Sequence, residues 1–287
     1  MDSGLLSTRP PAAEGYLNLV YYSTDAKQSF ICVRNGASSF AWRPISGGER
    51  FAATPNLQLL YRMTEDSGDI INYGSLASSN LTAQAGYVYQ QPVSDSTIGN
   101  GGGFLGTPSS YLEGAYGSEP GSGDLTVFAV FSTNGFHPSG GAIPILTREI
   151  GAPGGAWSSP WISVMLHVRN SPGIWGCDYS VAGTYYSCQA LSDSITLGRQ
   201  HVLVWTRNAT TGQTQLYKDG VASTTTTSGS PTGSIDWGSA GGAWRIGASG
   251  PTEKLTGGVL ECGVASTVWT EAQVIEHYQK TIGIYSL

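Results

Sequence analysis

Apolar and polar residues alternate with a period of two along most of the chain, which is the pattern of β-strands that turn one face to a core. Residues 161–169 follow this pattern strictly, so one face of that strand belongs to the core. That face carries Ile162, Val164, Leu166 and Val168. Residues 124–132 are apolar on both faces, which predicts a central strand covered on both sides. Further strands are expected at residues 56–61, 110–112, 173–179, 184–188, 201–206, 216–217, 244–247 and 258–264.

Local signals predict the turns and one helix. Asp219-Gly220 tolerates positive φ at both central positions of a tight turn, so it predicts a hairpin before Val221. The Gly-rich residues 99–103 predict a flexible turn. Thr270 and Gln273 form a capping box ahead of an apolar helical face, which predicts a short helix at the end of the chain. The core between two sheets is expected to contain Val127, Phe131, Val164, Trp205 and Ile246.

The composition agrees with an all-β protein. Of 287 residues, 40% are hydrophobic and only 12% are charged, while 40 are glycine. A chain poor in charge and rich in Gly is built from strands and tight turns. The formal net charge of −6 argues against nucleic-acid binding, which needs a concentrated basic surface. No apolar run is long enough for a spanning helix, so membrane insertion is not expected. We also expect no signal peptide, and assembly in a cytoplasm.

The first 47 residues are expected to form a separate small module, with a second domain at residues 48–287. Residues 16–22, 28–33 and 39–43 read as a three-stranded meander, which is too small to bury a core of its own. The alternative is an additional hairpin layer on the main domain. If the module is separate, its aromatic side chains need a covering partner and are candidates for assembly contacts. These are Tyr21, Tyr22, Phe30 and Trp42.

The order of short motifs in the second half resembles the laminin-G-like, concanavalin-A-like lectin family. A strand that ends in Trp205-Thr206 is followed by "LYKDGV", "WRIG", a Gly-rich strand with Glu261 and "WTEAQVIEHY". Upstream, "LLYRMTEDSGDIINYGS" and "DLTVFAVFSTN" extend the resemblance, whereas Cys262-Gly263 replaces apolar residues usual in the family. The resemblance implies an all-β, two-sheet antiparallel jelly-roll sandwich with a small N-terminal β-meander and a short C-terminal helix.

The N-terminal stretch is similar to a module of bacteriophage tail-fibre and other virion proteins. The similarity rests on an Arg-Pro lead, a "YYSTD" strand and turn, and the closing Trp42. It implies a non-enzymatic protein displayed on the virion surface, as head decoration or tail fibre, that docks on other virion structural proteins and forms a homo-oligomer, expected as a trimer. Two alternatives stay open: a polysaccharide depolymerase or glycosidase on the same sandwich, and a purely architectural decoration without a ligand.

A face of polar and aromatic residues is the candidate site for a host or environmental glycan. Sugar rings stack on aromatic side chains, while charged and amide groups bind their hydroxyls. The alternation of residues 161–169 turns Trp161, His167 and Arg169 away from the core. The predicted glycan-binding residues are Trp161, His167, Arg169, Trp175, Asp178, Tyr179 and Tyr185. The competing interpretation is that the aromatic residues are core.

Other chemistry is sparse in the sequence. A glycosidase on this fold needs paired carboxylates about 5 Å apart, as in an E-x-D-x-x-E strand, and the chain has no such triplet. Glu65, Asp66 and Asp69 are a candidate calcium loop, with a solvated loop as the preferred reading. Among the four cysteines, Cys177 and Cys188 flank a hairpin and are candidates for a disulfide, although buried free thiols are the preferred interpretation.

Overall fold

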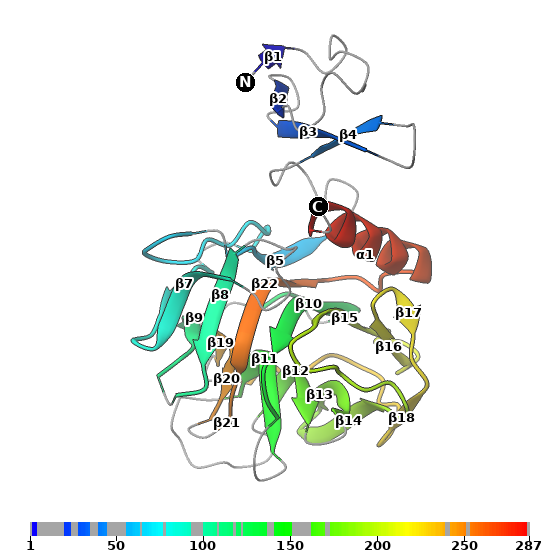
Figure 1. The fold of residues 1–287 in the computed structure, drawn as a ribbon. Helices are drawn as coiled ribbons and strands as arrows, with labels where there is room; N and C mark the ends of the chain where they lie inside the picture. The colour runs from blue at the N-terminus through cyan, green and yellow to red at the C-terminus, as the bar shows by residue number, and fades with distance from the viewer. Residues whose placement is uncertain are drawn as a thin grey trace. The chain divides into compact units, whose positions relative to one another are not determined.

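The computed structural model divides the chain into two compact units, residues Met1–Thr54 with Glu276–Leu287, and residues Pro55–Ile275 (Figure 1). In the N-terminal part it describes the backbone of four strands. From residue 56 to residue 285 it describes the chain except for residues 64, 77–78, 93–99, 108, 117–118, 122, 137–140, 151–161, 170–172, 239–241 and 251–252.

The N-terminal strands form one sheet in chain order. They are β1 (Asp2–Gly4), β2 (Val20–Ser23), β3 (Gln28–Arg34) and β4 (Phe40–Pro44). Strands β2 to β4 pair antiparallel, as the predicted meander requires, and β1 adds to β2 in parallel. The predicted assembly residues Tyr21, Tyr22, Phe30 and Trp42 lie in these strands, and their side chains are outside the described part of the structure.

The larger unit contains two antiparallel sheets of eight strands each. The first sheet has the order β17 (Val221–Ala222), β16 (Thr214–Lys218), β15 (Gln200–Arg207), β10 (Leu125–Thr133), β22 (Thr256–Ala265), β8 (Asn100–Leu105) and β7 (Tyr87–Pro92), with β5 (Leu57–Tyr61) also on β22. The second has the order β18 (Thr225–Thr227), β14 (Thr184–Ala190), β13 (Trp175–Val181), β12 (Ile162–Arg169), β11 (Ala142–Glu149), β19 (Ala243–Ile246), β9 (Leu112–Tyr116) and β6 (Leu81–Ala83). A two-stranded hairpin, β20 (Ala248–Ser249) and β21 (Glu253–Lys254), follows β19.

Side chains from both sheets meet in one hydrophobic core, which makes the unit a β-sandwich. Trp205 of the first sheet and Tyr179 of the second lie with their ring centroids 5.1 Å apart. The predicted core residues all belong to this cluster: Val127, Phe131, Val164, Trp205 and Ile246. Strand β10 is buried at every position, as its apolar faces predicted. The predicted all-β, two-sheet fold is therefore confirmed.

The predicted turn and helix cap are also present. Asp219 and Gly220 have φ of 52° and 80°, which places both central residues of the β16–β17 turn in the left-handed region. The helix α1 (Glu271–Tyr285) begins with the expected capping box. The Thr270 amide donates to Gln273 Oε1 at 2.8 Å, and the Gln273 amide donates to Thr270 Oγ1 at 3.3 Å. No described helix is both long and apolar enough to span a membrane.

The Gly-rich residues 100–103 are part of strand β8, so the expectation of a turn there is wrong. Gly101 lies so close to β22 that a Cβ atom would approach the Val259 carbonyl oxygen to 2.6 Å. At Gly102 a Cβ atom would meet the Tyr87 hydroxyl at 2.6 Å. These glycines allow close packing of strands and of an aromatic ring. In sequence, a Gly-rich strand of this kind has the same composition as a turn.

Cys177 and Cys188 lie directly opposite each other on β13 and β14. Together with Cys262 they are buried free thiols, in agreement with the preferred interpretation for these three residues. Burial raises the pKa of the Cys177 thiol well above its usual value, so the thiolate needed for exchange chemistry is disfavoured. Cys32 lies outside the residues whose side chains are described.

Candidate ligand site on the outer face of the second sheet

Three neighbouring strands place polar side chains on the face of the second sheet that points away from the core. Val164, Leu166 and Val168 of β12 belong to the core, so His167 and Arg169 alternate onto the opposite face. In the antiparallel register His167 pairs with Gly176, and Met165 pairs with Asp178. Asp178 is therefore a diagonal neighbour of His167 on the same face of the sheet. Ser187 of β14 faces Asp178 from the other side.

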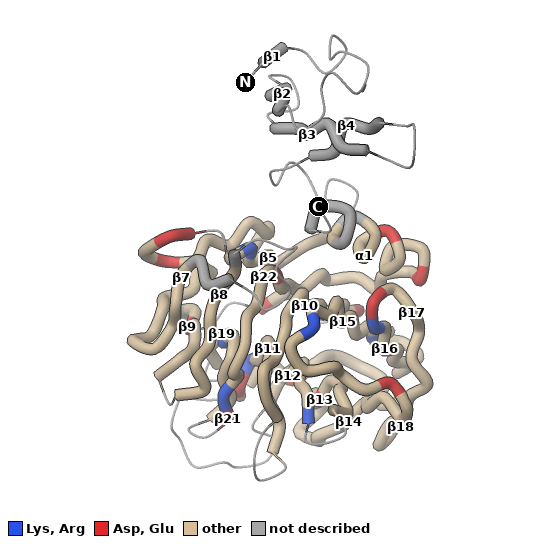
Figure 2. The backbone as a smooth tube through the Cα atoms, in the orientation of Figure 1, with Lys and Arg blue, Asp and Glu red and all other residues tan. Residues whose placement is uncertain are grey.

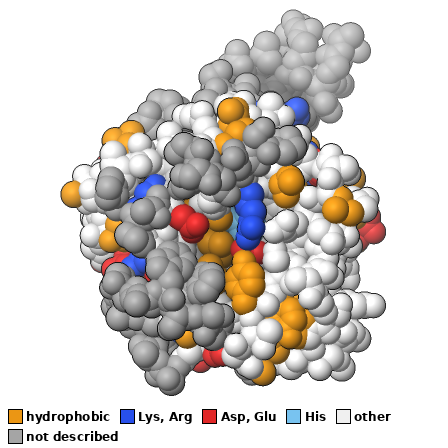
Figure 3. All heavy atoms as spheres, turned by 90° about the horizontal axis from the view of Figure 1, so that it is seen from below, with side chains coloured by type: hydrophobic (Ala, Val, Ile, Leu, Met, Phe, Trp, Pro, Cys, Tyr) orange, Lys and Arg blue, Asp and Glu red, His pale blue; other side chains and the backbone are white. Residues whose placement is uncertain are grey.

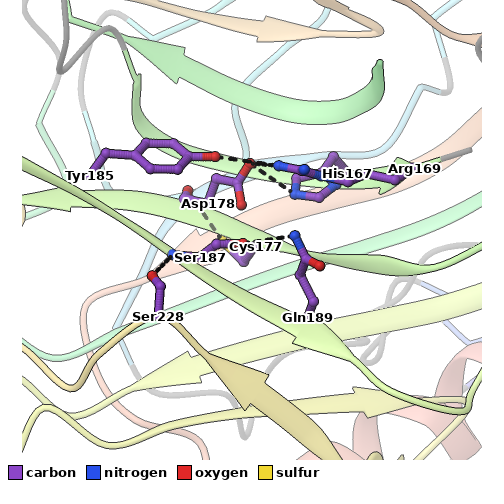
Figure 4. A network of polar contacts seen from close by, with 8 residues as sticks. All are labelled: His167, Arg169, Cys177, Asp178, Tyr185, Ser187, Gln189 and Ser228. Atoms are coloured by element: carbon purple, nitrogen blue, oxygen red, sulfur yellow. Dashed lines mark hydrogen bonds and ion pairs between the residues drawn. The ribbon is translucent and has the colours of Figure 1, made fainter. Parts of the chain in front are cut away.

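The carboxylate of Asp178 is the centre of this group (Figure 4). Its Oδ2 atom lies 2.9 Å from Arg169 Nη2 and 3.1 Å from His167 Nε2. Arg169 Nη2 also donates to the Tyr185 hydroxyl at 3.4 Å. His167 and Arg169 therefore meet on one oxygen atom, and Tyr185 joins them through Arg169. We call His167, Arg169, Asp178 and Tyr185 the Asp178 cluster.

The Asp178 cluster has a buried base and a partly exposed rim. The side chains of His167 and Asp178 are fully buried, whereas 37% of the Arg169 side chain is exposed. Tyr185 is half-buried. A molecule that approaches this face meets the guanidinium and the phenol ring first. Seen from below, the surface is hollowed, and basic, acidic and histidine side chains gather beside hydrophobic ones in the hollow (Figure 3).

The electrostatics of the cluster favour a charged Asp178. Burial by itself raises the pKa of a carboxyl, but His167 and Arg169 outweigh burial and hold the pKa of Asp178 below its ordinary value of 3.8. Burial also lowers the pKa of the Arg169 guanidinium, and Asp178 more than reverses that shift. Burial and the nearby Asp178 raise the pKa of the Tyr185 hydroxyl, so this hydroxyl stays protonated and able to donate.

Three polar atoms of the cluster have no hydrogen-bond partner within the described part of the chain. They are Asp178 Oδ1, His167 Nδ1 and Arg169 Nε, and each is buried. The close contact between His167 Nε2 and Asp178 Oδ2 also departs from good hydrogen-bond geometry. A buried polar atom that lacks a partner costs about 1 to 3 kcal/mol. The cluster therefore has unused capacity for hydrogen bonds.

Neutral polar groups continue the site along β14. Gln189 Nε2 donates to Ser187 Oγ at 3.0 Å, and the Ser187 amide donates to Ser228 Oγ at 2.8 Å (Figure 4). Gly176 lies between His167 and Gln189 in the sheet register. No larger residue fits at this position, because a Cβ atom would lie 2.3 Å from the Cys188 carbonyl oxygen.

Sequence reasoning located part of this site. The structure brings together His167, Arg169, Asp178 and Tyr185 from the predicted glycan-binding set, and Trp161 lies outside the described residues. Trp175 and Tyr179 are fully buried in the core, so the expectation that they are exposed is wrong. They alternate with Asp178 along β13, and residues an odd number of positions apart on a strand point to opposite faces.

The candidate calcium loop has its carboxylates engaged separately. Glu65 Oε1 accepts the Ile71 amide at 3.0 Å, and Asp69 Oδ1 accepts the Thr82 hydroxyl at 3.0 Å. Asp66 is exposed. Within the described residues no three His, Cys, Asp or Glu side chains are arranged to hold a metal ion. Calcium binding by this loop stays a prediction.

A second charged group on the same face was missed in the sequence. Arg245 binds Glu113 at 2.6 Å and Glu149 at 2.9 Å. Glu149 also accepts the Gly250 amide at 2.7 Å, which ties the β20–β21 hairpin to β11. Figure 2 shows how few charged residues lie along the sandwich, so charged groups such as this one are sparse. The three residues are far apart in sequence, and the only signal for their proximity is the antiparallel register of β9, β19 and β11.

Comparison with known proteins gives a fold and no family. No family model matches the sequence, and no curated protein matches it either. Solved structures do match in three dimensions. Domain 4 of a GH43 extracellular arabinanase from Geobacillus stearothermophilus, in complex with arabinotriose, aligns with 78% of this chain and 98% of its own, at 14% identity and a TM-score of 0.50.

Two larger proteins share the same architecture over part of their length. The binding domain of Paraclostridial Mosquitocidal Protein 1 aligns with 80% of this chain at 10% identity and a TM-score of 0.56. Trypanosoma rangeli sialidase aligns with 90% of this chain at 13% identity and a TM-score of 0.53. The chain spans 55% of the former and 43% of the latter. At these identities the likeness establishes the β-sandwich fold alone.

Proposed function

We propose that this protein binds carbohydrate without catalysis, and that the Asp178 cluster is its sugar site. The observation that carries the proposal is the set of buried, unpartnered polar atoms beside the half-exposed Arg169 and Tyr185. A sugar hydroxyl both donates and accepts hydrogen bonds, so it complements a carboxylate oxygen and a guanidinium N–H at the same time. The Tyr185 ring supplies an apolar surface for the C–H groups of a sugar ring.

The fold supports this proposal by analogy only. The arabinanase domain that shares the fold was solved with a bound arabinotriose, and the sialidase was solved in complex with 2,3-difluorosialic acid. β-Sandwiches of this shape also serve other functions, so the geometry of the Asp178 cluster carries more weight than the fold. The assignment to the laminin-G-like, concanavalin-A-like family is likewise part of the proposal.

The absence of catalysis is proposed from the way the neighbouring carboxylates are used. Glu113 and Glu149 approach the same side chain, but the Arg245 guanidinium lies between them and binds both. A glycosidase needs one protonated and one free carboxyl around the scissile bond. This pair is instead occupied by Arg245, and Glu149 also accepts the Gly250 amide, which suits a role in fixing the β20–β21 hairpin. The depolymerase and the ligand-free architectural protein remain the alternatives to be tested.

For its biological setting we propose display on the surface of a bacteriophage virion, as a head decoration or a tail fibre. This part rests on the similarity of the N-terminal stretch to virion modules. The four-stranded sheet of residues 2–44 would attach the protein to other virion proteins, or join three copies, and the sandwich would face host or environmental glycans. Assembly would then take place in the host cytoplasm.

Replacing Arg169 with glutamine should reduce glycan binding by at least tenfold while the sandwich stays folded. The substitution removes the exposed donor that a ligand reaches first but keeps a polar side chain of similar length. Binding of the wild type and the variant would be compared on a glycan array, and affinities for the positive glycans measured by calorimetry. The same glycans would be incubated with wild-type protein and assayed for new reducing ends, which we expect to be absent.

Arg199→Gln is the matched control, because Arg199 is exposed and lies in the loop before β15. It should bind like the wild type. Equal glycan binding by the wild type, Arg169→Gln and Arg199→Gln would contradict the Asp178 cluster as the sugar site. Release of reducing ends that depends on Glu113 or Glu149 would establish the depolymerase instead.

Deleting residues 1–47 should leave a folded, monomeric sandwich that no longer joins virions or oligomers. The expected physical cause is that a small sheet buries too little apolar surface alone and gains stability from a partner. Light scattering would give the mass of the full-length and truncated chains, and co-sedimentation with virions would test attachment. A truncated protein that still forms the same oligomer and co-sediments equally would contradict the role of this segment.

A further inference from the structure

We infer that the Asp178 cluster selects neutral glycans and discriminates against acidic ones. The inference deepens the proposed function and rests on it. It concerns the chemical class of the sugar and follows from the charges and the unpartnered atoms on this face of the second sheet.

The cation at the rim of the cluster is already paired with a carboxylate. Arg169 is the cation nearest the surface, and its Nη2 atom is bound to Asp178 at 2.9 Å. A ligand carboxylate at Arg169 would lie within a few ångströms of the Asp178 carboxylate, in a base where both Asp178 and His167 are fully buried. Like charges this close in a poorly solvated site repel strongly.

In the second charged group on this face, the cations are also matched by carboxylates. Arg245 is matched by Glu113 and Glu149, and Lys254 joins Arg245 over the Tyr111 ring, with the Lys254 amine 4.7 Å from the ring centroid. Thr82, Glu113, Arg245, Thr147, Met165, Asp178 and Ser187 form one row across seven strands. The row contains one cation, Arg245, and two carboxylates, Glu113 and Asp178, among four uncharged residues, so no stretch of it attracts a polyanion.

The unpartnered atoms are instead suited to hydroxyl groups. Asp178 Oδ1 can only accept, Arg169 Nε can only donate, and the two lie on side chains that are already joined. Both atoms are buried, so a ligand reaches them only when the half-exposed Arg169 side chain moves. A hydroxyl group can then donate to the first and accept from the second, whereas a carboxylate can satisfy only the second. Tyr185, Ser187 and Gln189 extend the rim with uncharged groups. The pattern matches a neutral polyol such as a hexose or pentose chain.

The test compares two classes of polysaccharide on the wild-type protein at low and high salt. Arabinan, dextran and a β-1,3-glucan are the neutral probes, and polygalacturonate, hyaluronan and polysialic acid are the acidic ones. We expect at least one neutral probe to bind at least tenfold more tightly than every acidic probe. Its affinity should change less than twofold between 20 mM and 500 mM salt, because screening weakens only charge-driven binding.

Asp178→Asn is the diagnostic variant, because it leaves the shape of the side chain but removes its charge. It should lose at least tenfold in affinity for the neutral probe and gain affinity for acidic probes, since Arg169 is then uncompensated. Glu271→Gln, an exposed acidic residue at the start of α1, is the matched control and should change neither. If Asp178→Asn does not fold, Arg169→Gln on the same probes replaces it and should lose the neutral probe without gaining an acidic one.

The outcomes distinguish a failure of the inference from a failure of the proposed function. Salt-sensitive binding of an acidic probe that depends on Arg169 would overturn the inference and leave the sugar site in place. Binding of the neutral probe that is unchanged in Asp178→Asn and in Arg169→Gln would refute the Asp178 cluster as the site that selects the sugar. No binding of either class by the wild type would overturn the proposed function and the inference together.

Discussion

Truncating Trp205 to alanine should lower the free energy of unfolding by about 3 to 5 kcal/mol, the range for large aromatic residues in cores. Trp205 lies in the middle of β15, between Val127 of β10 and Leu216 of β16, and is fully buried. Its ring lies against Tyr179 of the other sheet. Removing it opens a cavity at the junction of the two sheets that strands on both sides cannot close without breaking their register.

Chemical denaturation followed by tryptophan-independent far-UV signals would measure this loss. Trp205→Phe should cost less than the alanine variant, because it refills much of the cavity and the indole Nε1 atom has no hydrogen-bond partner within the described residues. Val221→Ala is the surface control, since 68% of Val221 is exposed. A loss below about 1 kcal/mol for Trp205→Ala would mean that the sheets do not share the core described above.

Replacing Asp178 with alanine should lower the free energy of unfolding by about 2 to 4 kcal/mol at neutral pH. Removing one partner of a fully buried ion pair costs about 3 to 5 kcal/mol. The lower range applies here because Arg169 keeps 37% of its side chain in solvent, which screens part of the unpaired charge. Asp178→Asn should lose less, because the amide still accepts a hydrogen bond from Arg169.

The contribution of Asp178 should also depend on pH in a defined direction. The pKa of Asp178 is lower in the folded chain than its ordinary value of 3.8, so folding favours the charged form. The stabilisation is therefore complete above about pH 5 and is lost as the pH falls through 4 toward the depressed pKa. The difference in unfolding free energy between wild type and Asp178→Asn should shrink across this window. A difference that stays constant from pH 7 to pH 2 would contradict the charged, paired state of Asp178.

The fold was more accessible to sequence reasoning than the site, and particular residues explain why. Residues 124–132 and 161–169 are long and regular enough for their faces to be assigned from apolar alternation alone. The turn at Asp219-Gly220 and the capping box at Thr270 are local signals that need no tertiary information. Strand β11 was not predicted, because Pro144 interrupts its pattern and its register is irregular beside that residue.

The site depends on how strands pair, which the sequence does not carry directly. The predicted set mixed Trp175 and Tyr179 with Asp178, although β13 turns the aromatic residues to the core and the carboxylate outward. Only the register of β12, β13 and β14 brings His167, Asp178 and Tyr185 together. The same holds for Glu113, Arg245 and Glu149. A stricter use of strand alternation would have separated the core aromatics from the outer face.

The most direct test of the proposed sugar site is an NMR titration of the unpartnered atoms themselves. Protein labelled with ¹⁵N on arginine and histidine side chains would be titrated with the neutral oligosaccharide that binds most tightly. We expect the Arg169 Nε–H and the His167 ring resonances to shift in a saturable way with one affinity. The Arg199 Nε–H and the His201 ring, which is bound to Asp219, should not move. Saturable binding that shifts neither Arg169 nor His167 would contradict the account.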